Sequence, residues 1–86
     1  MFLISRHRKF VKKFVKLPLK VRIKFEQRLL VFISDPFSKE LNNHSVENRF
    51  SGCRSINVSG DYRAIYKFEN DIALFVNIGT HSELYD

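Results

Sequence analysis

The sequence predicts an α+β fold with the element order β-α-α-β-β-β, in which an antiparallel sheet carries a helical hairpin on one face. Two patterns support this. Apolar residues recur at helical spacing up to residue 33, and three β-rich runs with short polar connections follow Gly52. The 86 residues suffice for one modest core, so we expect a single domain over residues 1–86 and exclude a Rossmann or barrel enzyme.

The first part of the chain predicts a strand and two helices. The short apolar run 2–4 suits a strand, and Ser5 is the expected N-cap of a helix over about 6–16. The apolar residues of this helix recur at helical spacing, as Phe10, Val11, Phe14 and Leu17. A second helix starts at Pro18 and continues until residues 35–36 stop it.

The rest of the chain predicts a loop and a meander of three strands. Residues 34–51 are polar and rich in turn formers, which indicates a loop with one helical turn. The strands are expected at 53–58, 62–68 and 72–78. Along the middle strand, alternation separates Arg63 and Lys67 from the side that carries Ala64 and Tyr66. Because the helices cover one face, functional residues are expected on the open one.

Positive charge is concentrated at the N-terminus. The chain has 15 Lys and Arg against 9 Asp and Glu, a formal net charge of +6, and residues 1–24 hold nine of the cations and no carboxylate. Cations without interspersed acids repel one another unless a partner neutralises them. The charge pattern therefore favours nucleic acid, or else an acidic protein, as partner over a merely solvated helix face.

No cofactor or membrane segment is indicated. Cys53 has no second cysteine to pair with, and the three histidines are not spaced as zinc ligands. No apolar run approaches the roughly 18 residues of a membrane helix. We therefore expect a cytoplasmic protein without a metal or small-molecule cofactor.

Several candidate reactive side chains are expected on the open face and its rims. They are His44, Arg54, Asp61, Arg63, Lys67, His81 and Tyr85. Cations of this kind stabilise charge on phosphate oxygens, while titratable groups move protons at the attacking and leaving oxygens. RNA supplies its own nucleophile, the 2′-hydroxyl, so the set suits metal-independent RNA cleavage. A plain basic nucleic-acid-binding module is the alternative that the residues leave open.

Two runs of residues make the chain resemble a known superfamily. Residues 60–66 are GDYRAIY, and residues 78–85 at the C-terminus are IGTHSELY. Together with the Lys-Leu-Pro sequence at 16–18, they resemble the RelE/ParE toxin superfamily, most closely its YafQ-like mRNA interferases. The resemblance extends over nearly the whole chain, and the C-terminal run is its most specific element.

The resemblance implies a ribosome-dependent endoribonuclease that cuts mRNA in the ribosomal A site and is held inactive by a cognate antitoxin. His81 matches a proton-transfer histidine, acid or base, and Tyr85 the aromatic that orients the nucleotide. Arg63 matches a strand arginine that contacts the scissile phosphate. Asp61 and His44 match an acidic residue near the hairpin turn and a loop histidine. The other cations are expected to bind RNA: Arg54, Lys67, Lys9, Lys12, Lys13 and Lys16. For the four N-terminal lysines among them, the expected partner is ribosomal RNA.

Two positions depart from the pattern. Ser55 and Asn57 stand where YafQ-like enzymes commonly carry an acidic residue and a histidine, and neither acts as a base unaided near neutral pH. Proton transfer then depends mainly on His81, His44 and Asp61. The alternatives are a catalytically weakened toxin and a ParE-like gyrase inhibitor that binds without cleaving RNA. His81 and Tyr85 favour the nuclease, because a binder needs no proton-transfer group at that position.

Overall fold

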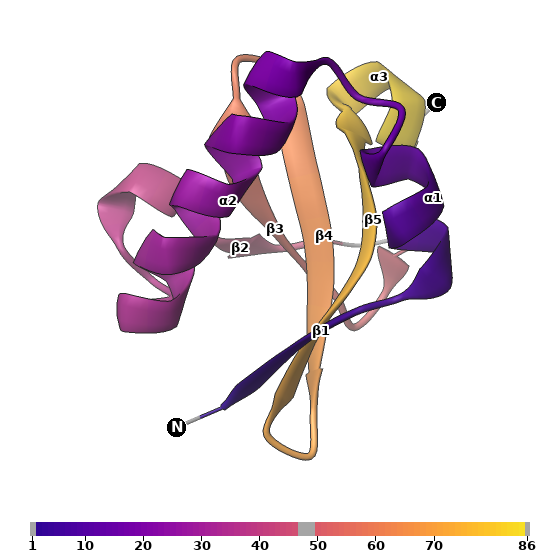
Figure 1. Cartoon of the computed structure of the whole chain (residues 1–86). Helices are drawn as coiled ribbons and strands as arrows, with labels where there is room; N and C mark the ends of the chain where they lie inside the picture. The colour runs from indigo at the N-terminus through magenta and orange to yellow at the C-terminus, as the bar shows by residue number, and fades with distance from the viewer. Residues whose placement is uncertain (1, 47–49, 86) are drawn as a thin grey trace.

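The computed structural model describes residues 2–46 and 50–85 and confirms the predicted fold class (Figure 1). The first elements are β1 (Leu3–Arg6), α1 (Arg8–Phe14), α2 (Leu19–Ser34), the 3-10 helix η1 (Lys39–Leu41) and β2 (His44–Ser45). They are followed by β3 (Arg54–Ser59), β4 (Tyr62–Glu69), β5 (Ile72–Thr80) and α3 (His81–Tyr85). None of the described helices is long and apolar enough to cross a membrane.

The strands form one sheet in the order β1-β5-β4-β3-β2. β3, β4 and β5 make the predicted antiparallel meander. β1 pairs with β5 in parallel, so the sheet is mixed where a wholly antiparallel one was predicted. The segment predicted as a loop contains the expected helical turn, η1, and also the short strand β2, which extends the sheet beside β3.

The first helix is shorter than the predicted 6–16. Ser5, the predicted N-cap, belongs to β1 and pairs with Leu74. The helix begins after His7, whose Nδ1 accepts a hydrogen bond from the backbone N–H of Lys9 at 3.0 Å. Pairing with β5 therefore extends the strand and outweighs the local preference of serine for a cap, because tertiary contacts override such propensities.

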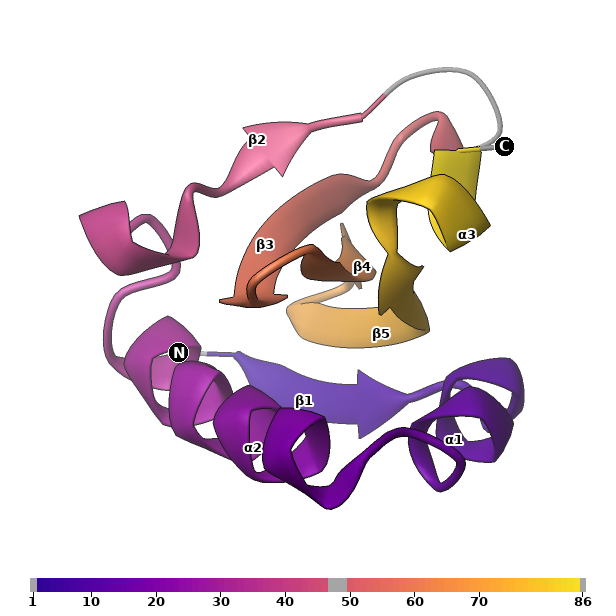
Figure 2. The same cartoon turned by 90° about the horizontal axis from the view of Figure 1, so that it is seen from above.

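The two faces of the sheet carry core clusters of different size. α2 lies against one face of the sheet and α3 lies toward the other, while α1 follows β1 at the edge of the sheet (Figure 2). The larger core cluster is dominated by aromatic and branched side chains, including Phe10, Phe25, Phe32, Ile56, Val58, Tyr66 and Phe75. The second cluster is small and consists of Val46, Cys53, Ile65 and Leu84. The face with the small cluster retains room for a site.

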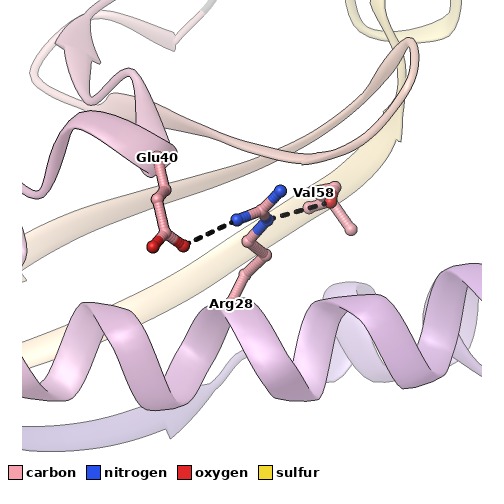
Figure 3. A network of polar contacts seen from close by, with 3 residues as sticks. All are labelled: Arg28, Glu40 and Val58. Atoms are coloured by element: carbon pink, nitrogen blue, oxygen red, sulfur yellow. Dashed lines mark hydrogen bonds and ion pairs between the residues drawn. The ribbon is translucent and has the colours of Figure 1, made fainter.

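Arg28 of α2 connects the helix to the segment that leads to this site (Figure 3). Its Nη1 donates to Glu40 Oε2 of η1 at 3.0 Å, and its Nε donates to the Val58 carbonyl of β3 at 3.3 Å. One side chain thus links α2, η1 and β3. Beyond η1, Asn42 adopts φ 46°, a left-handed conformation that asparagine tolerates, and turns the chain into β2.

Candidate active site

A pocket of about 210 Å³ lies on the sheet face opposite α2. Its lining residues come from β2 and the residue after it, β3, β4 and α3: His44, Ser45, Val46, Ser55, Arg63, His81 and Tyr85. Four of the five predicted catalytic residues therefore lie around one pocket. We call it the first pocket.

Arg63 brings an uncompensated positive charge to the first pocket. Its Nη1 donates to the carbonyls of Gly60 at 2.9 Å and Tyr62 at 3.1 Å, which fixes the guanidinium against the hairpin turn. Among residues 2–46 and 50–85, no carboxylate forms an ion pair with it, and its Nε and Nη2 have no acceptor. A planar guanidinium with free donors is well suited to a phosphate.

The hydrogen bond of His44 determines which ring nitrogen carries the proton. Its Nδ1 lies 2.8 Å from the carbonyl oxygen of Asn42. A carbonyl only accepts, so Nδ1 carries the hydrogen and the neutral ring has its free lone pair on Nε2. His44 is exposed on β2, so this nitrogen is able to take a proton from a bound substrate.

α3 begins with a reciprocal cap that places His81 in its first turn. The backbone N–H of Thr80 donates to Glu83 Oε1 at 2.8 Å, and the backbone N–H of Glu83 donates to Thr80 Oγ1 at 3.2 Å. This is the capping box of the pattern Thr-x-x-Glu. The bond from the Thr80 backbone lowers the pKa of Glu83 below its ordinary value. One turn later, the Tyr85 ring centre lies 4.7 Å from that of His81.

Gly79 permits a close approach of α1 and α3 to the end of β5. A Cβ at this position would lie 3.0 Å from Glu83 Oε1 and 3.3 Å from Lys13 Nζ. Lys13 donates to Asn77 Oδ1 at 2.7 Å, and burial there lowers the pKa of the Lys13 ammonium group. The α1 lysine thus holds the strand that leads into α3, and its attraction to Glu83 opposes the effect of burial.

Ser55 and Asn57 carry buried oxygen atoms that have no hydrogen-bond partner among residues 2–46 and 50–85. Ser55 is 1% exposed, and its Oγ is unsatisfied although the residue lines the first pocket. Asn57 Oδ1 is likewise unpaired. An unsatisfied buried polar group is costly, so such a group beside a pocket marks a place where a ligand can supply the missing hydrogen bond.

The remaining predicted residues lie outside the first pocket. Asp61 is exposed in the hairpin turn, and its backbone carbonyl accepts a hydrogen bond from the His81 N–H at 3.0 Å. Arg54 donates to Asn43 Oδ1 at 2.7 Å, and its guanidinium lies 5.1 Å from the centre of the Phe37 ring. Asp61 therefore contacts α3 of the site through its backbone carbonyl. The Arg54 side chain lies beside the first pocket and is already in contact with Asn43 and Phe37.

The lysines divide into three groups. Lys9 and Lys67 line a second pocket on the sheet. Lys13 is turned inward onto β5. Lys12 and Lys16 are exposed. The four N-terminal lysines were expected to bind ribosomal RNA together, whereas the structure separates them by the direction of their side chains.

The capping residues are functional candidates that sequence reasoning missed. The spacing of Thr80 and Glu83 is visible in the sequence and is typical of a helix N-terminus. It would have predicted α3, which the proposed element order lacked. Within the described part of the chain, no group of three His, Cys, Asp or Glu side chains is placed to hold a metal ion.

Comparison with known proteins identifies the family. The model of YafQ, a bacterial toxin of type II toxin-antitoxin systems, matches residues 3–86. This chain belongs to the YafQ toxin family. No curated protein sequence matches this YafQ-family toxin.

Solved structures share the fold of this YafQ-family toxin. YafQ from Escherichia coli strain BL21(DE3) is 24% identical with a TM-score of 0.79, and each chain is covered in full. The toxin of the E. coli DinJ-YafQ complex is 22% identical with a TM-score of 0.70, again over all of both chains. The match in the RelE-RelB complex from Pyrococcus horikoshii OT3 is 18% identical with a TM-score of 0.72, over 92% of this chain and 93% of the other.

Proposed function

We propose that this YafQ-family toxin is a ribosome-dependent endoribonuclease that cleaves mRNA in the ribosomal A site. The observation that carries the proposal is the convergence of His44, Arg63 and His81 on one pocket. Two proton-transfer groups and a guanidinium without an ion-pair partner in the described chain are the parts that cleavage by the 2′-hydroxyl of RNA requires. The nucleophile comes from the substrate, so these protein groups suffice.

The proposed reaction assigns the two histidines opposite roles. Nε2 of His44 takes the proton of the 2′-hydroxyl, whose oxygen then forms a bond to the phosphorus atom. The bond from phosphorus to the 5′-oxygen breaks, and the protonated ring of His81 donates its proton to that oxygen. Arg63 stabilises the charge that grows on the non-bridging oxygens. The products carry a 2′,3′-cyclic phosphate and a 5′-hydroxyl.

The hydrogen bond of His44 supports its assignment as the base. Asn42 holds the proton on Nδ1 and leaves Nε2 as the acceptor in the neutral ring. His81 then remains as the acid on the opposite side of the reaction. Tyr85, in ring contact with His81, holds the nucleotide in the in-line geometry, a positioning role.

A cognate antitoxin is the proposed protein partner. The E. coli DinJ-YafQ structure is a toxin-antitoxin complex, and this chain shares the fold of the protein that it matches there. The net charge of +6 favours an acidic antitoxin segment by electrostatic steering. Co-expression with the neighbouring open reading frame, followed by purification through the toxin, would recover the pair.

Primer extension on translated mRNA tests the proposed function. With the toxin present during translation, we expect cuts at codon positions, and with naked mRNA far fewer. Intact mRNA together with gyrase-dependent DNA breaks would select the gyrase inhibitor instead. Intact mRNA without DNA breaks, from a folded toxin that still binds ribosomes, would select the catalytically weakened form.

A further inference from the structure

A second pocket of about 260 Å³ lies on the sheet between α1 and β4. Its floor consists of apolar side chains of β5, and Phe50 lines it as well. The polar residues around it are His7, Lys9, Lys67 and Asn77. None of these residues belongs to the catalytic set proposed for the first pocket.

Asn77 presents a hydrogen-bond donor to the second pocket. Its Oδ1 accepts from Lys13 Nζ at 2.7 Å and from the backbone N–H of Ile78 at 2.9 Å. Both partners are donors, so the amide oxygen must face them and the Nδ2 group must point away. Asn77 is only 6% exposed, and its Nδ2 has no acceptor within residues 2–46 and 50–85.

The other polar groups of the second pocket are donors too. Nδ1 of His7 accepts from the Lys9 backbone, so in the neutral ring the hydrogen is on Nε2. Lys9 forms no ion pair with any described carboxylate. Lys67 lies 3.4 Å from Glu69, an exposed pair of little strength. Among the described side chains that line this pocket, four present donors and none presents a free acceptor, which suits a ligand rich in anionic oxygen atoms.

The two pockets are joined by an aromatic contact. Phe50 of the second pocket and Tyr85 of the first have ring centres 6.0 Å apart, with the rings perpendicular. An RNA strand has both chemistries that the second pocket offers, because its phosphates are acceptors and its bases pack on aromatic rings. The pockets are thus placed to hold neighbouring nucleotides of one strand.

We propose that the second pocket binds an RNA nucleotide next to the one held in the first pocket. Lys9, Lys67 and the Nδ2 group of Asn77 contact its phosphate, and the base packs against Phe50. The inference rests on the proposed nuclease function and extends it to a second nucleotide site. It also gives Lys9 a contact with mRNA in place of the ribosomal RNA contact expected from the helix pattern.

Binding of short RNA of increasing length tests the second site. The probes are fluorescent 2′-O-methyl oligonucleotides of one to five nucleotides, which lack the reactive hydroxyl, and anisotropy gives their Kd. For the wild type we expect a gain on the order of tenfold once both pockets are filled. Asn77→Asp should abolish this gain, because the variant retains the oxygen that Lys13 requires but turns a carboxylate oxygen toward the phosphate.

Two further variants keep the test independent of folding. Lys9→Gln changes an exposed side chain and should lose most of the length-dependent gain. Gln27→Glu makes the same charge change as Asn77→Asp on the exposed side of α2 and should retain the gain. Equal gains in the wild type, Asn77→Asp and Lys9→Gln would overturn the proposal. So would variants that bind RNA normally but lose the antitoxin, since the pocket would then belong to a protein ligand.

Cleavage of translated mRNA by the wild type separates this inference from the proposed function. A gain in binding with oligonucleotide length, in a toxin that cuts no mRNA, would refute the nuclease and support the second site. Cleavage by a toxin that shows no such gain would refute the second site and support the nuclease.

Discussion

Thr80 and Glu83 cap each other's backbone N–H groups at 2.8 and 3.2 Å, immediately around the histidine proposed as the acid. The cap orients the first turn of α3. Asp61 adds a third bond through its carbonyl to the His81 N–H. The backbone around His81 is therefore held by hydrogen bonds on both sides, while its ring contacts Tyr85 and lines the first pocket.

Removal of the capping bonds should weaken the orientation of His81, the proposed acid, without removing its ring. Glu83→Ala leaves the Thr80 N–H without its acceptor and should lower the free energy of unfolding by about 0.3–1.5 kcal/mol. It should also lower kcat more than it raises KM, because His81 loses its orientation. Glu83→Gln retains an acceptor oxygen and serves as the matched control. Denaturant unfolding and single-turnover cleavage check both effects, and equal kcat in the two variants would contradict the positioning role.

The fold should become less stable at acid pH because the Glu83 carboxylate becomes protonated. The Thr80 backbone bond and, more weakly, the charge of Lys13 hold the pKa of Glu83 below its ordinary value of 4.5. A carboxylate with a lowered pKa in the folded state stabilises the fold above its unfolded pKa, and this contribution is lost as the pH falls through the folded pKa. The advantage of the wild type over Glu83→Gln should therefore shrink between about pH 6 and pH 3. Thermal unfolding across that range measures it, and a constant difference would refute the linkage.

The two histidines should respond differently to a better leaving group. His81→Ala should lose about 10²- to 10⁴-fold in cleavage while ribosomes and antitoxin still bind. A substrate with sulfur in place of the 5′-oxygen needs little protonation of its leaving group. This substrate should restore much of the rate to His81→Ala and little to His44→Ala. Rescue of His44→Ala alone would reverse the two assignments.

Ser55→Ala should raise the stability of the fold and weaken RNA binding. The Ser55 hydroxyl is buried without a partner in the described part of the chain, so its removal should stabilise the fold by about 1–3 kcal/mol. The same change removes a donor from the wall of the first pocket and should weaken RNA binding. Calorimetry and oligonucleotide anisotropy measure the two quantities. A variant that is less stable than the wild type would show that the hydroxyl has a partner in solution.

The exposed lysines should control the salt dependence of ribosome binding. Lys12→Gln with Lys16→Gln should weaken ribosome association and lower its salt slope by about one for each lost phosphate contact. The fold and the affinity for short RNA should stay unchanged, because neither side chain lines the first or the second pocket. Lys20→Gln with Lys24→Gln on α2 removes equal charge elsewhere and is the control. An unchanged slope in sedimentation assays would place ribosomal contacts on another surface.

Much of the fold was predictable because it depends on neighbours in the sequence. Helical spacing predicted α2, and hairpin connections predicted the meander of β3, β4 and β5. Alternation along β4 placed Arg63 and Lys67 on the face opposite Tyr66, and the structure has them there, with Tyr66 in the main core and the two cations lining pockets. These patterns indicate which side of a helix or strand is buried, and they involve only residues that are close together in the sequence.

The tertiary structure decided which distant groups meet. The pairing of β1 with β5 joins residues about seventy positions apart, converts Ser5 from a cap into a strand residue and shifts the helix start to His7. The packing of α1 against β5 turns Lys13 inward while Lys12 stays outside. Such contacts form because they bury apolar faces and satisfy polar groups across the fold. Neither requirement is expressed in the spacing of neighbouring residues, so the sequence predicted most of the elements and the candidate site residues, and only the packed sheet determined the pockets that these residues line.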